Sequence, residues 1–298
     1  MSAATSSPAR TAFAFILVTL IWGSTWLVIK DQISAVPPAW TVTWRFSLAS
    51  LGMILLAAFR RESLRLTGEG MRLAAVVGVV QFCGNFQFVY RAEHYLTSGL
   101  VAVLFALLIV PNALLSRLFL RVRVSARFLA GSLVAIGGIA LLLANEYRMA
   151  PLGGSVVLGV ALTLGGLLAA SIGNVLQATK AARRQSVVPL MAWAMIWGAL
   201  ANAVFSWISS GTPAFDPRPQ YFAGIAYLAL VGSVVTFPLY STLIRDMGAG
   251  RAAYNGVAVP VVAMALSTLF EGFRWSALAA GGAVLAIAGL LVALSGRK

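Results

Sequence analysis

The chain has 298 residues, of which 60% are apolar and 10% are charged, with a mean hydropathy of +0.90. So little polar sequence cannot coat a water-soluble globule of this size, so the composition excludes a soluble domain and predicts an integral membrane protein. The formal net charge of +14 does not indicate nucleic-acid binding, because the Lys and Arg residues stand singly or in short groups between apolar runs, as in membrane loops.

Ten apolar runs follow one another along the chain, each close to the roughly 20 residues that a helix needs to cross a bilayer. The first opens at Arg10 and ends near residue 29. We interpret it as a mature span, because no small-residue cleavage site follows it as one would in a signal peptide. The other nine are expected at 37–59, 73–90, 96–115, 127–144, 154–178, 187–209, 221–244, 251–270 and 275–294.

Two stretches, 118–143 and 269–294, agree at ten of 26 positions when laid over each other. Upstream, Gly99 and Pro111 have the same spacing as Gly248 and Pro260. The repeat unit is therefore about half the chain. We expect one five-helix unit over 1–149 and a second over 150–298, together forming one compact membrane domain.

Lys and Arg divide unequally between alternate connections, with 16 on one side and five on the other. Positively charged loops stay in the cytoplasm, so both termini are predicted to be cytoplasmic. Because each unit holds an odd number of spans, the second unit must cross in the opposite sense. The predicted fold class is all-α, with ten transmembrane helices in two inverted five-helix repeats around a central cavity, an architecture typical of secondary transporters.

The first span carries Trp22-Gly23-Ser24-Thr25-Trp26 and ends in Val28-Ile29-Lys30, followed by Pro37-Pro38 and Arg45. With the later Pro260, Glu271 and glycine-rich last helix, this order resembles EamA-type transporters of the drug/metabolite transporter superfamily, over nearly the whole chain. The resemblance implies a ten-helix basket and export of metabolites such as amino acids. One departure is Leu120-Arg121-Val122-Arg123, where the family usually carries an acid.

Ionisable residues within the predicted spans are few. Arg45 would lie about 12 Å into its helix, where it could contact an anion or tie neighbouring helices together; we favour the structural role. The acids lie in the connections, so we expect no proton relay through a buried carboxylate. Cys83 stands alone in an apolar run. The sequence predicts neither a metal site nor a cofactor nor a catalytic residue.

Uncharged polar and aromatic residues are the remaining candidates for a binding site. Gln81 and Asn85 share one helix face, and polar residues recur at helical spacing on the sixth and eighth spans. Amide dipoles with apolar walls would suit the head group and side chain of an amino acid, whereas helix packing explains each residue singly. The predicted substrate-binding residues are Trp22, Gln81, Phe82, Asn85, Phe105, Ser171, Asn174, Tyr240, Tyr254 and Asn255.

Proline and glycine recur at matching places in the two units. Pro111 and Pro260 each remove a backbone donor, so they are interpreted as a matched hinge or as static bends. Gly137, Gly138 and the glycines of the last helix permit close helix contact, either within the protomer or at a dimer seam. The sequence does not decide the oligomeric state.

The favoured hypothesis is therefore a non-enzymatic secondary transporter in a bacterial-type inner membrane, exporting small neutral or zwitterionic amphipathic metabolites, above all amino acids. A phosphate-ester or nucleotide-sugar carrier is the weaker alternative, because such cargo needs several cavity cations. An integral membrane enzyme acting on lipid-linked substrate is weaker still, since the acids are unpaired with histidine. The expected partners are a small-molecule substrate and the lipid bilayer, without nucleic acid.

Overall fold

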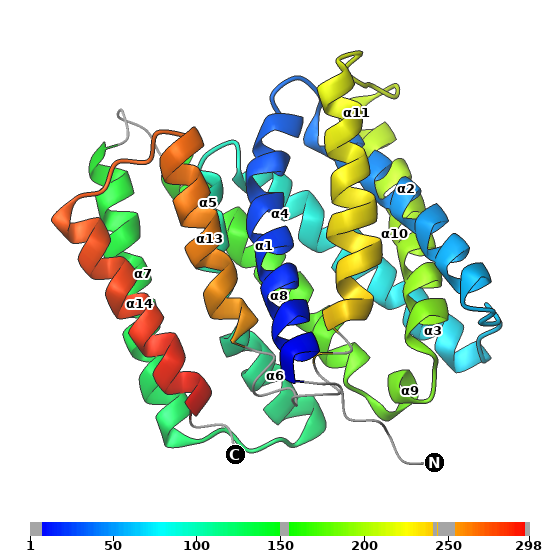
Figure 1. Ribbon diagram of the computed structural model, residues 1–298, viewed down its shortest axis with the longest axis horizontal. Coiled ribbons are helices and arrows are strands. Elements are labelled where there is room, and N and C mark those ends of the chain that lie inside the picture. The colour runs from blue at the N-terminus through cyan, green and yellow to red at the C-terminus, as the bar shows by residue number, and fades with distance from the viewer. Residues whose placement is uncertain (1–7, 150–154, 241–242, 244–253, 296–298) are drawn as a thin grey trace.

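A computed structural model describes residues 8–149, 155–240, 243 and 254–295, and these ranges are helical apart from their connections. Nine helices of the described chain are long and apolar enough to cross a membrane, and the shorter apolar helix Asn255–Phe270 is the tenth. Figure 1 shows them side by side in one layered bundle. The all-helical membrane fold predicted from the sequence is confirmed.

The first five spans comprise one unit. Their elements are α1 (Pro8–Gln32), α2 (Pro38–Phe59), α3 (Gly68–Val77) with η1 (Gly78–Asn85) and α4 (Phe86–Ala92), then α5 (Ser98–Phe105) with η2 (Ala106–Leu108) and α6 (Ile109–Leu120), and α7 (Ala126–Met149).

The second unit has a similar order. Its elements are α8 (Ser155–Gln177), the short α9 (Lys180–Arg183), α10 (Val187–Ser210), α11 (Pro219–Ala226) with η3 (Tyr227–Val235) and a helical continuation to residue 240, α13 (Asn255–Phe270) and α14 (Ala277–Ser295). Four of the 16 cations on the predicted cytoplasmic side, as well as Gly248, lie outside the described residues: Arg245, Arg251, Arg297 and Lys298.

Local chemistry sets several helix ends. Pro38 opens α2 at a position where its missing N–H costs nothing. The Thr67 hydroxyl accepts a 3.0 Å bond from Gly70 N, so the third span begins at Gly68 rather than at the predicted residue 73. Tyr254 precedes α13 as its cap, and the helix itself begins at Asn255.

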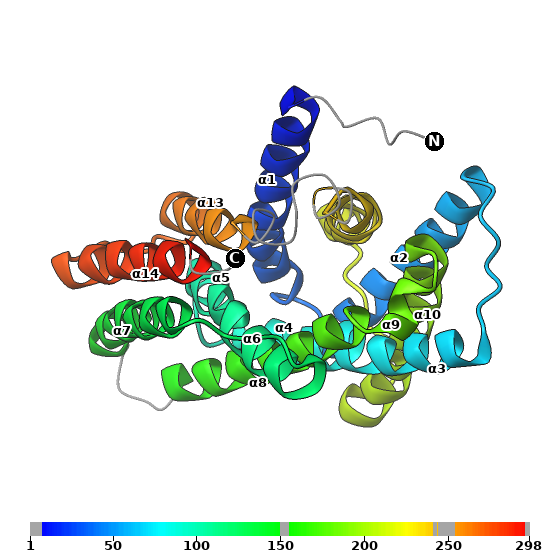
Figure 2. The same ribbon diagram turned by 90° about the horizontal axis from the view of Figure 1, so that it is seen from below.

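Equivalent helices of the two units pack antiparallel. In the pair α7 and α14, a Cβ on Gly131 would lie 2.6 Å from the carbonyl oxygen of Gly289, and one on Gly138 would lie 2.6 Å from that of Gly282. The residue numbers of α14 that meet α7 therefore fall as the residue numbers of α7 rise, which makes the two helices antiparallel. Figure 1 and Figure 2 both show α7 beside α14 at one edge of the bundle. The units are thus inverted with respect to each other.

The pair α2 and α10 repeats this relation at the other side of the bundle. Thr43, near the start of α2, hydrogen-bonds Ser206 near the end of α10 at 2.8 Å. Trp193, near the start of α10, donates to the Leu64 carbonyl just beyond α2 at 2.8 Å. The main apolar core extends between these helices and η1, with Phe46, Met53, Phe82 and Met195 fully buried.

The glycines of the fifth and tenth spans form an intramolecular seam. Gly131, Gly138, Gly282 and Gly289 each face backbone atoms of the opposite helix closer than a side chain allows. Gly137 and Gly281 face open space instead. The seam settles the packing of the first four, because only hydrogen atoms fit between two backbones at this distance.

Candidate functional site

Trp22 joins α1 to the eighth span. Its indole Nε1 donates to Thr236 Oγ1 at 3.0 Å and to the Gly232 carbonyl at 3.3 Å. Its ring packs on Phe237 and Tyr240, with centroids 5.9 and 5.0 Å away. Two of the predicted residues, Trp22 and Tyr240, are therefore brought together by contacts spanning more than two hundred positions.

A row of aromatic rings continues from this pair into the core. Phe82, fully buried on η1, packs edge-on against Phe237 at 5.8 Å and against Phe46 at 5.2 Å. Phe46 in turn contacts the half-buried Phe86 at 4.7 Å. Phe105 belongs to a separate contact, with Trp26 at 5.5 Å. The row connects α1, α2, η1 and the eighth span by aromatic side chains.

Three buried polar oxygens lie on η1 and α8. Gln81 Oε1, Asn85 Oδ1 and Ser171 Oγ have no hydrogen-bond partner among the described residues. A Cβ on Gly173 would lie 2.5 Å from Gln81 Oε1, and one on Gly166 would lie 3.1 Å from the Asn85 carbonyl, so η1 packs directly on α8 here. Because desolvated oxygens normally find a donor, these three oxygens are unused hydrogen-bonding capacity on the two elements that meet here.

The other predicted polar residues have partners. Asn174 Nδ2 lies 3.5 Å from Asn112 Oδ1 and so links α8 to α6. Asn255 Nδ2 donates to Thr19 Oγ1 at 2.8 Å and links α13 to α1. Tyr254 packs against the apolar cluster around α7 and α14. Tyr254 and Asn255 thus belong to other helix contacts, whereas Asn174 is on α8 beside Gly173, which packs on Gln81.

Arg45 is buried at the junction of α2, α4 and η3. Its guanidinium donates to Tyr90 Oη at 3.0 Å and to Ser233 Oγ at 3.4 Å, and it lies 4.6 Å from the Phe86 ring centre. The Ser233 hydroxyl donates in turn to the Leu228 carbonyl, five residues earlier in the π-helical turn. The two terminal guanidinium nitrogens of Arg45 therefore have partners within the protein, whereas its Nε has none in the described chain.

The two prolines differ in their surroundings. Pro111 follows the 3₁₀ turn η2, which interrupts the fourth span at Ala106–Leu108. Pro260 lies inside the continuous helix α13 and is buried. The fourth span changes its helical geometry before its proline, whereas α13 does not. The matched hinge stays a prediction.

Glu93 is a buried acid whose burial the sequence does not reveal. It follows α4 in a connection, as expected of the acids, but it is 0% exposed, and neither carboxyl oxygen has a hydrogen-bond partner in the described chain. Burial raises the pKa of this carboxyl well above its ordinary value, against the opposing charge of Lys30. Glu93 does lie in a connection, as expected, but its burial was not foreseen; the expectation that no proton relay runs through a buried carboxylate stays a prediction.

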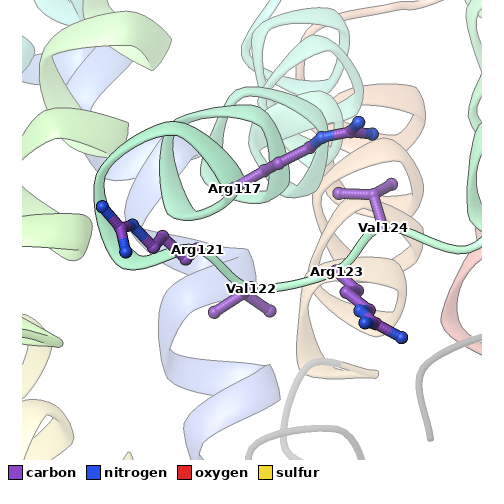
Figure 3. Close-up of a pocket in the computed structure, with 5 residues that line it drawn as sticks. All are labelled: Arg117, Arg121, Val122, Arg123 and Val124. Carbon is purple, nitrogen blue, oxygen red and sulfur yellow. The ribbon is translucent and has the colours of Figure 1, made fainter.

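Two hollows in the described structure lie away from these residues. One, of about 480 Å³, is lined by Arg117, Arg121, Val122, Arg123 and Val124. Figure 3 shows its three arginine side chains pointing away from one another, so they do not converge on an anion. The other, of about 470 Å³, is an almost wholly apolar groove between α5, α13 and α14 that includes Pro260.

Charge pairs and metal ligands are few in the described part of the chain. Arg218 and Asp216, at 2.5 Å, form its one recorded ion pair, and hydrogen bonds from Arg218 lower the pKa of Asp216. No cluster of three His, Cys, Asp or Glu residues suited to a metal occurs within the ranges described. Apart from the buried Arg45 and Glu93, the polar side chains described above for the interior are uncharged, and they lie beside aromatic rings.

Comparison with known proteins follows the same division into halves. The chain matches the profile described as the EamA-like transporter family over residues 9–144 and again over 157–295. A solved crystal structure with 20% identity superposes with a TM-score of 0.70, covering 98% of this chain and 99% of that one, and shows a shared fold.

Curated relatives resemble the chain over most of their length. Protein PagO of Salmonella typhimurium is 27% identical over 270 residues, covering 88% of this chain and 85% of that protein. An Escherichia coli protein named as a probable amino-acid metabolite efflux pump is 26% identical over 292 residues, covering 95% and 94%. The uncharacterized inner membrane transporter YedA of Escherichia coli is 29% identical over 266 residues, covering 87% and 82%.

Proposed function

The chain belongs to the EamA-like transporter family, and from that premise we propose that it exports small neutral or zwitterionic metabolites, with amino acids as the preferred class. The proposal places it in a bacterial-type inner membrane with both termini in the cytoplasm. The relatives named as an inner membrane transporter and as an amino-acid metabolite efflux pump support this class of cargo and this membrane.

The unpartnered oxygens of Gln81, Asn85 and Ser171 carry the proposal. Amide oxygens accept hydrogen bonds from an ammonium group, and a serine hydroxyl donates one to a carboxylate. A zwitterion that entered between η1 and α8 would supply the missing partners. A buried polar oxygen whose hydrogen bond is not made costs about 1–3 kcal/mol, so three such oxygens on the two packed elements η1 and α8 favour a ligand over packing as their explanation.

The aromatic row supplies the apolar wall of the same site. Phe82 lies on η1 next to Gln81, and its ring leads through Phe237 to Trp22. Small-molecule sites combine apolar walls with a few placed polar groups. In our proposal the site is exposed by rocking one unit against the other, as inverted repeats permit, and a central cavity opens there.

Phosphate esters and lipid-linked substrates fit this interior less well. Phosphate recognition draws on several cations, and Arg45, an arginine buried among the described spans, already donates to Tyr90 and Ser233. Enzymatic activity lacks support from the site, since its polar groups are amides and a hydroxyl without a neighbouring base. We therefore propose transport alone.

Transport by purified protein in liposomes tests the proposal. Vesicles loaded with unlabelled threonine, methionine or phenylalanine should accumulate the labelled amino acid by counterflow, with saturable kinetics. Absence of saturable counterflow across a panel of neutral amino acids would overturn the assigned substrate class.

Two alanine variants then test the site. Ser171→Ala and Gln81→Ala should lower counterflow while the protein stays folded. Ser132→Ala is the matched control, because its hydroxyl is also buried without a partner but lies on α7, away from the site. Equal loss of transport in both serine variants would show that a general packing effect is responsible.

A further inference from the structure

Glu93 has no role in the substrate site, yet its surroundings are unusual. It caps the end of α4, where the chain turns towards α5. It is fully buried, and its two carboxyl oxygens have no hydrogen-bond partner within the described ranges. An ionised carboxylate in such a place would be far from stable, so the group is held neutral.

The connection that carries Glu93 is clamped from both sides. From α1, Lys30 Nζ donates to the backbone carbonyl of Glu93 and, at 3.1 Å, to that of Leu96. From the end of α13, the Glu271 carboxylate accepts bonds from Ser98 N at 3.2 Å and from Ser98 Oγ at 2.5 Å. Residues 93–97, here called the 93–97 connection, are thus held by the first span directly and by the ninth span through Ser98, the first residue of α5.

Lys30 bonds the backbone of this connection and makes no ion pair with the Glu93 carboxyl in the described chain. Lys30 and Arg45 favour the ionised form, whereas Glu271 opposes it. Arg45 donates a hydrogen bond to Tyr90. Glu146 is a second carboxyl that interacts electrostatically with Lys30. Burial exceeds these effects and raises the pKa of Glu93.

The other charged neighbours do not offset burial. Arg91 donates to Gln87 and lies over the Phe205 ring, turned away from the connection. Burial and the nearby cations Lys30 and Arg91 lower the pKa of His94, which keeps that side chain neutral.

Proton occupancy and packing are therefore linked. Because the pKa is raised in the packed arrangement, that arrangement is favoured at low pH and loses its advantage as pH rises through the raised pKa. Loss of the proton would draw Lys30 from the backbone carbonyls to the new carboxylate, which removes one side of the clamp.

We propose that Glu93 is the proton site that couples export to proton entry, an inference that rests on the transport function proposed above. A proton from water on the Lys30 side binds the carboxylate while the 93–97 connection is open. The connection then closes over the neutral carboxyl. The proton leaves to water on the opposite side after the bundle opens there, and the next substrate leaves the cell in exchange.

Proteoliposomes that contain a pH-sensitive dye separate coupling from transport. With a transported amino acid inside and none outside, its efflux through the wild type should acidify the lumen, and a protonophore should abolish the signal. Counterflow without proton movement in the wild type would overturn the proton site and leave the transport function standing. Absence of counterflow would overturn the transport function, and this inference with it.

Three variants assign the site. Glu93→Gln should keep counterflow and lose substrate-driven acidification, whereas acidification that persists would exclude Glu93. Asp31→Asn is the matched control, since Asp31 is an exposed acid beside Lys30, and it should acidify the lumen as the wild type does. Should Glu93→Gln fail to fold, Glu93→Asp keeps a carboxyl and should retain acidification with a shifted pH profile, and an unchanged profile would contradict the proposal.

Discussion

An amide oxygen without a hydrogen-bond partner, such as Gln81 Oε1, lowers the stability of the fold that buries it. Gln81 packs on Gly173 of α8, where the absence of a Cβ leaves room for the amide. A buried amide that lowers the free energy of unfolding is best explained by a function, here the proposed binding of substrate. Replacing the Gln81 amide by an apolar side chain should therefore raise stability and lower transport.

Gln81→Met tests that opposition. Methionine has a similar volume and no polar oxygen, so the melting temperature in detergent should rise, reflecting a gain of about 1–3 kcal/mol, while counterflow falls. Asn202→Leu is the contrasting variant, since the Asn202 amide bonds Gln87 and the Phe82 carbonyl, both at 2.8 Å, and its loss should lower the melting temperature. Unchanged transport in Gln81→Met would argue that Gln81 serves packing alone.

Sequence pattern identified some of these residues and could not place others. A spacing of four residues predicts that Gln81 and Asn85 share a helix face. Both do lie on η1, and both are buried. Glu93 could not be recognised in this way. Its surroundings include Lys30 and Glu271, which lie 63 residues before it and 178 after it, and local hydropathy contains no information on such neighbours.

Helix ends of the two units share a positive φ but not a residue type. Arg61 and Arg121 have φ values of 54° and 55°, and the corresponding positions of the second unit are Gly211 and Gly272, both at 70°. Glycine adopts this conformation freely, whereas other residues pay about 1–2 kcal/mol. The first unit therefore accepts strain to keep arginine at these ends, where the predicted topology needs positive charge.

Arg61→Gly should relieve that strain. We expect stability to rise by a few tenths to about 1 kcal/mol, because the relief is partly offset by the greater freedom of glycine in the unfolded chain. Arg60→Gly removes the same charge at a residue with a φ of −81° and should lower stability. Melting temperatures of the two variants in one detergent provide the comparison. Equal shifts in both variants would show that the backbone at Arg61 is not strained.

The glycine seam between α7 and α14 predicts a sharp difference between neighbouring residues. A Cβ at position 138 would lie 2.3 Å from Ala286 N, and since backbone atoms cannot move aside, Gly138→Ala should force the helices apart and lower the melting temperature. Gly137→Ala meets nothing within 4 Å and should raise stability by about 0.5–1 kcal/mol through helix propensity. Similar effects in both variants would contradict the seam.

Elements were easier to predict than their internal geometry. Long apolar runs identified every span to within a few residues in the described ranges, because crossing a bilayer requires about 20 apolar residues. The π-helical segments η1 and η3 were not foreseen. They begin at residues 78 and 227, an offset of 149 that matches the repeat, but one widened turn changes the hydrophobic pattern too little to detect.

The whole molecule joins two inverted units whose charges differ. The sequence places 16 cations on one side and five on the other, and the two arginines in left-handed turns belong to the richer side. An inverted pair of identical units would have no preferred orientation. In the predicted topology, charge at the helix ends decides which way the protein inserts, and in the proposed transport cycle inversion supplies the alternation between its two faces.

Cysteine labelling in intact cells checks that orientation. In a Cys83→Ser background, Ser63→Cys and Thr212→Cys each place one exposed thiol at opposite ends of the α2–α10 pair. A membrane-impermeant maleimide should label Thr212→Cys in intact cells and Ser63→Cys only after permeabilisation, because the arginine-rich end stays in the cytoplasm. The reverse pattern would invert the assigned topology and would turn the Lys30 end, with Glu93, towards the cytoplasm, which would require the proton to move with the substrate rather than against it.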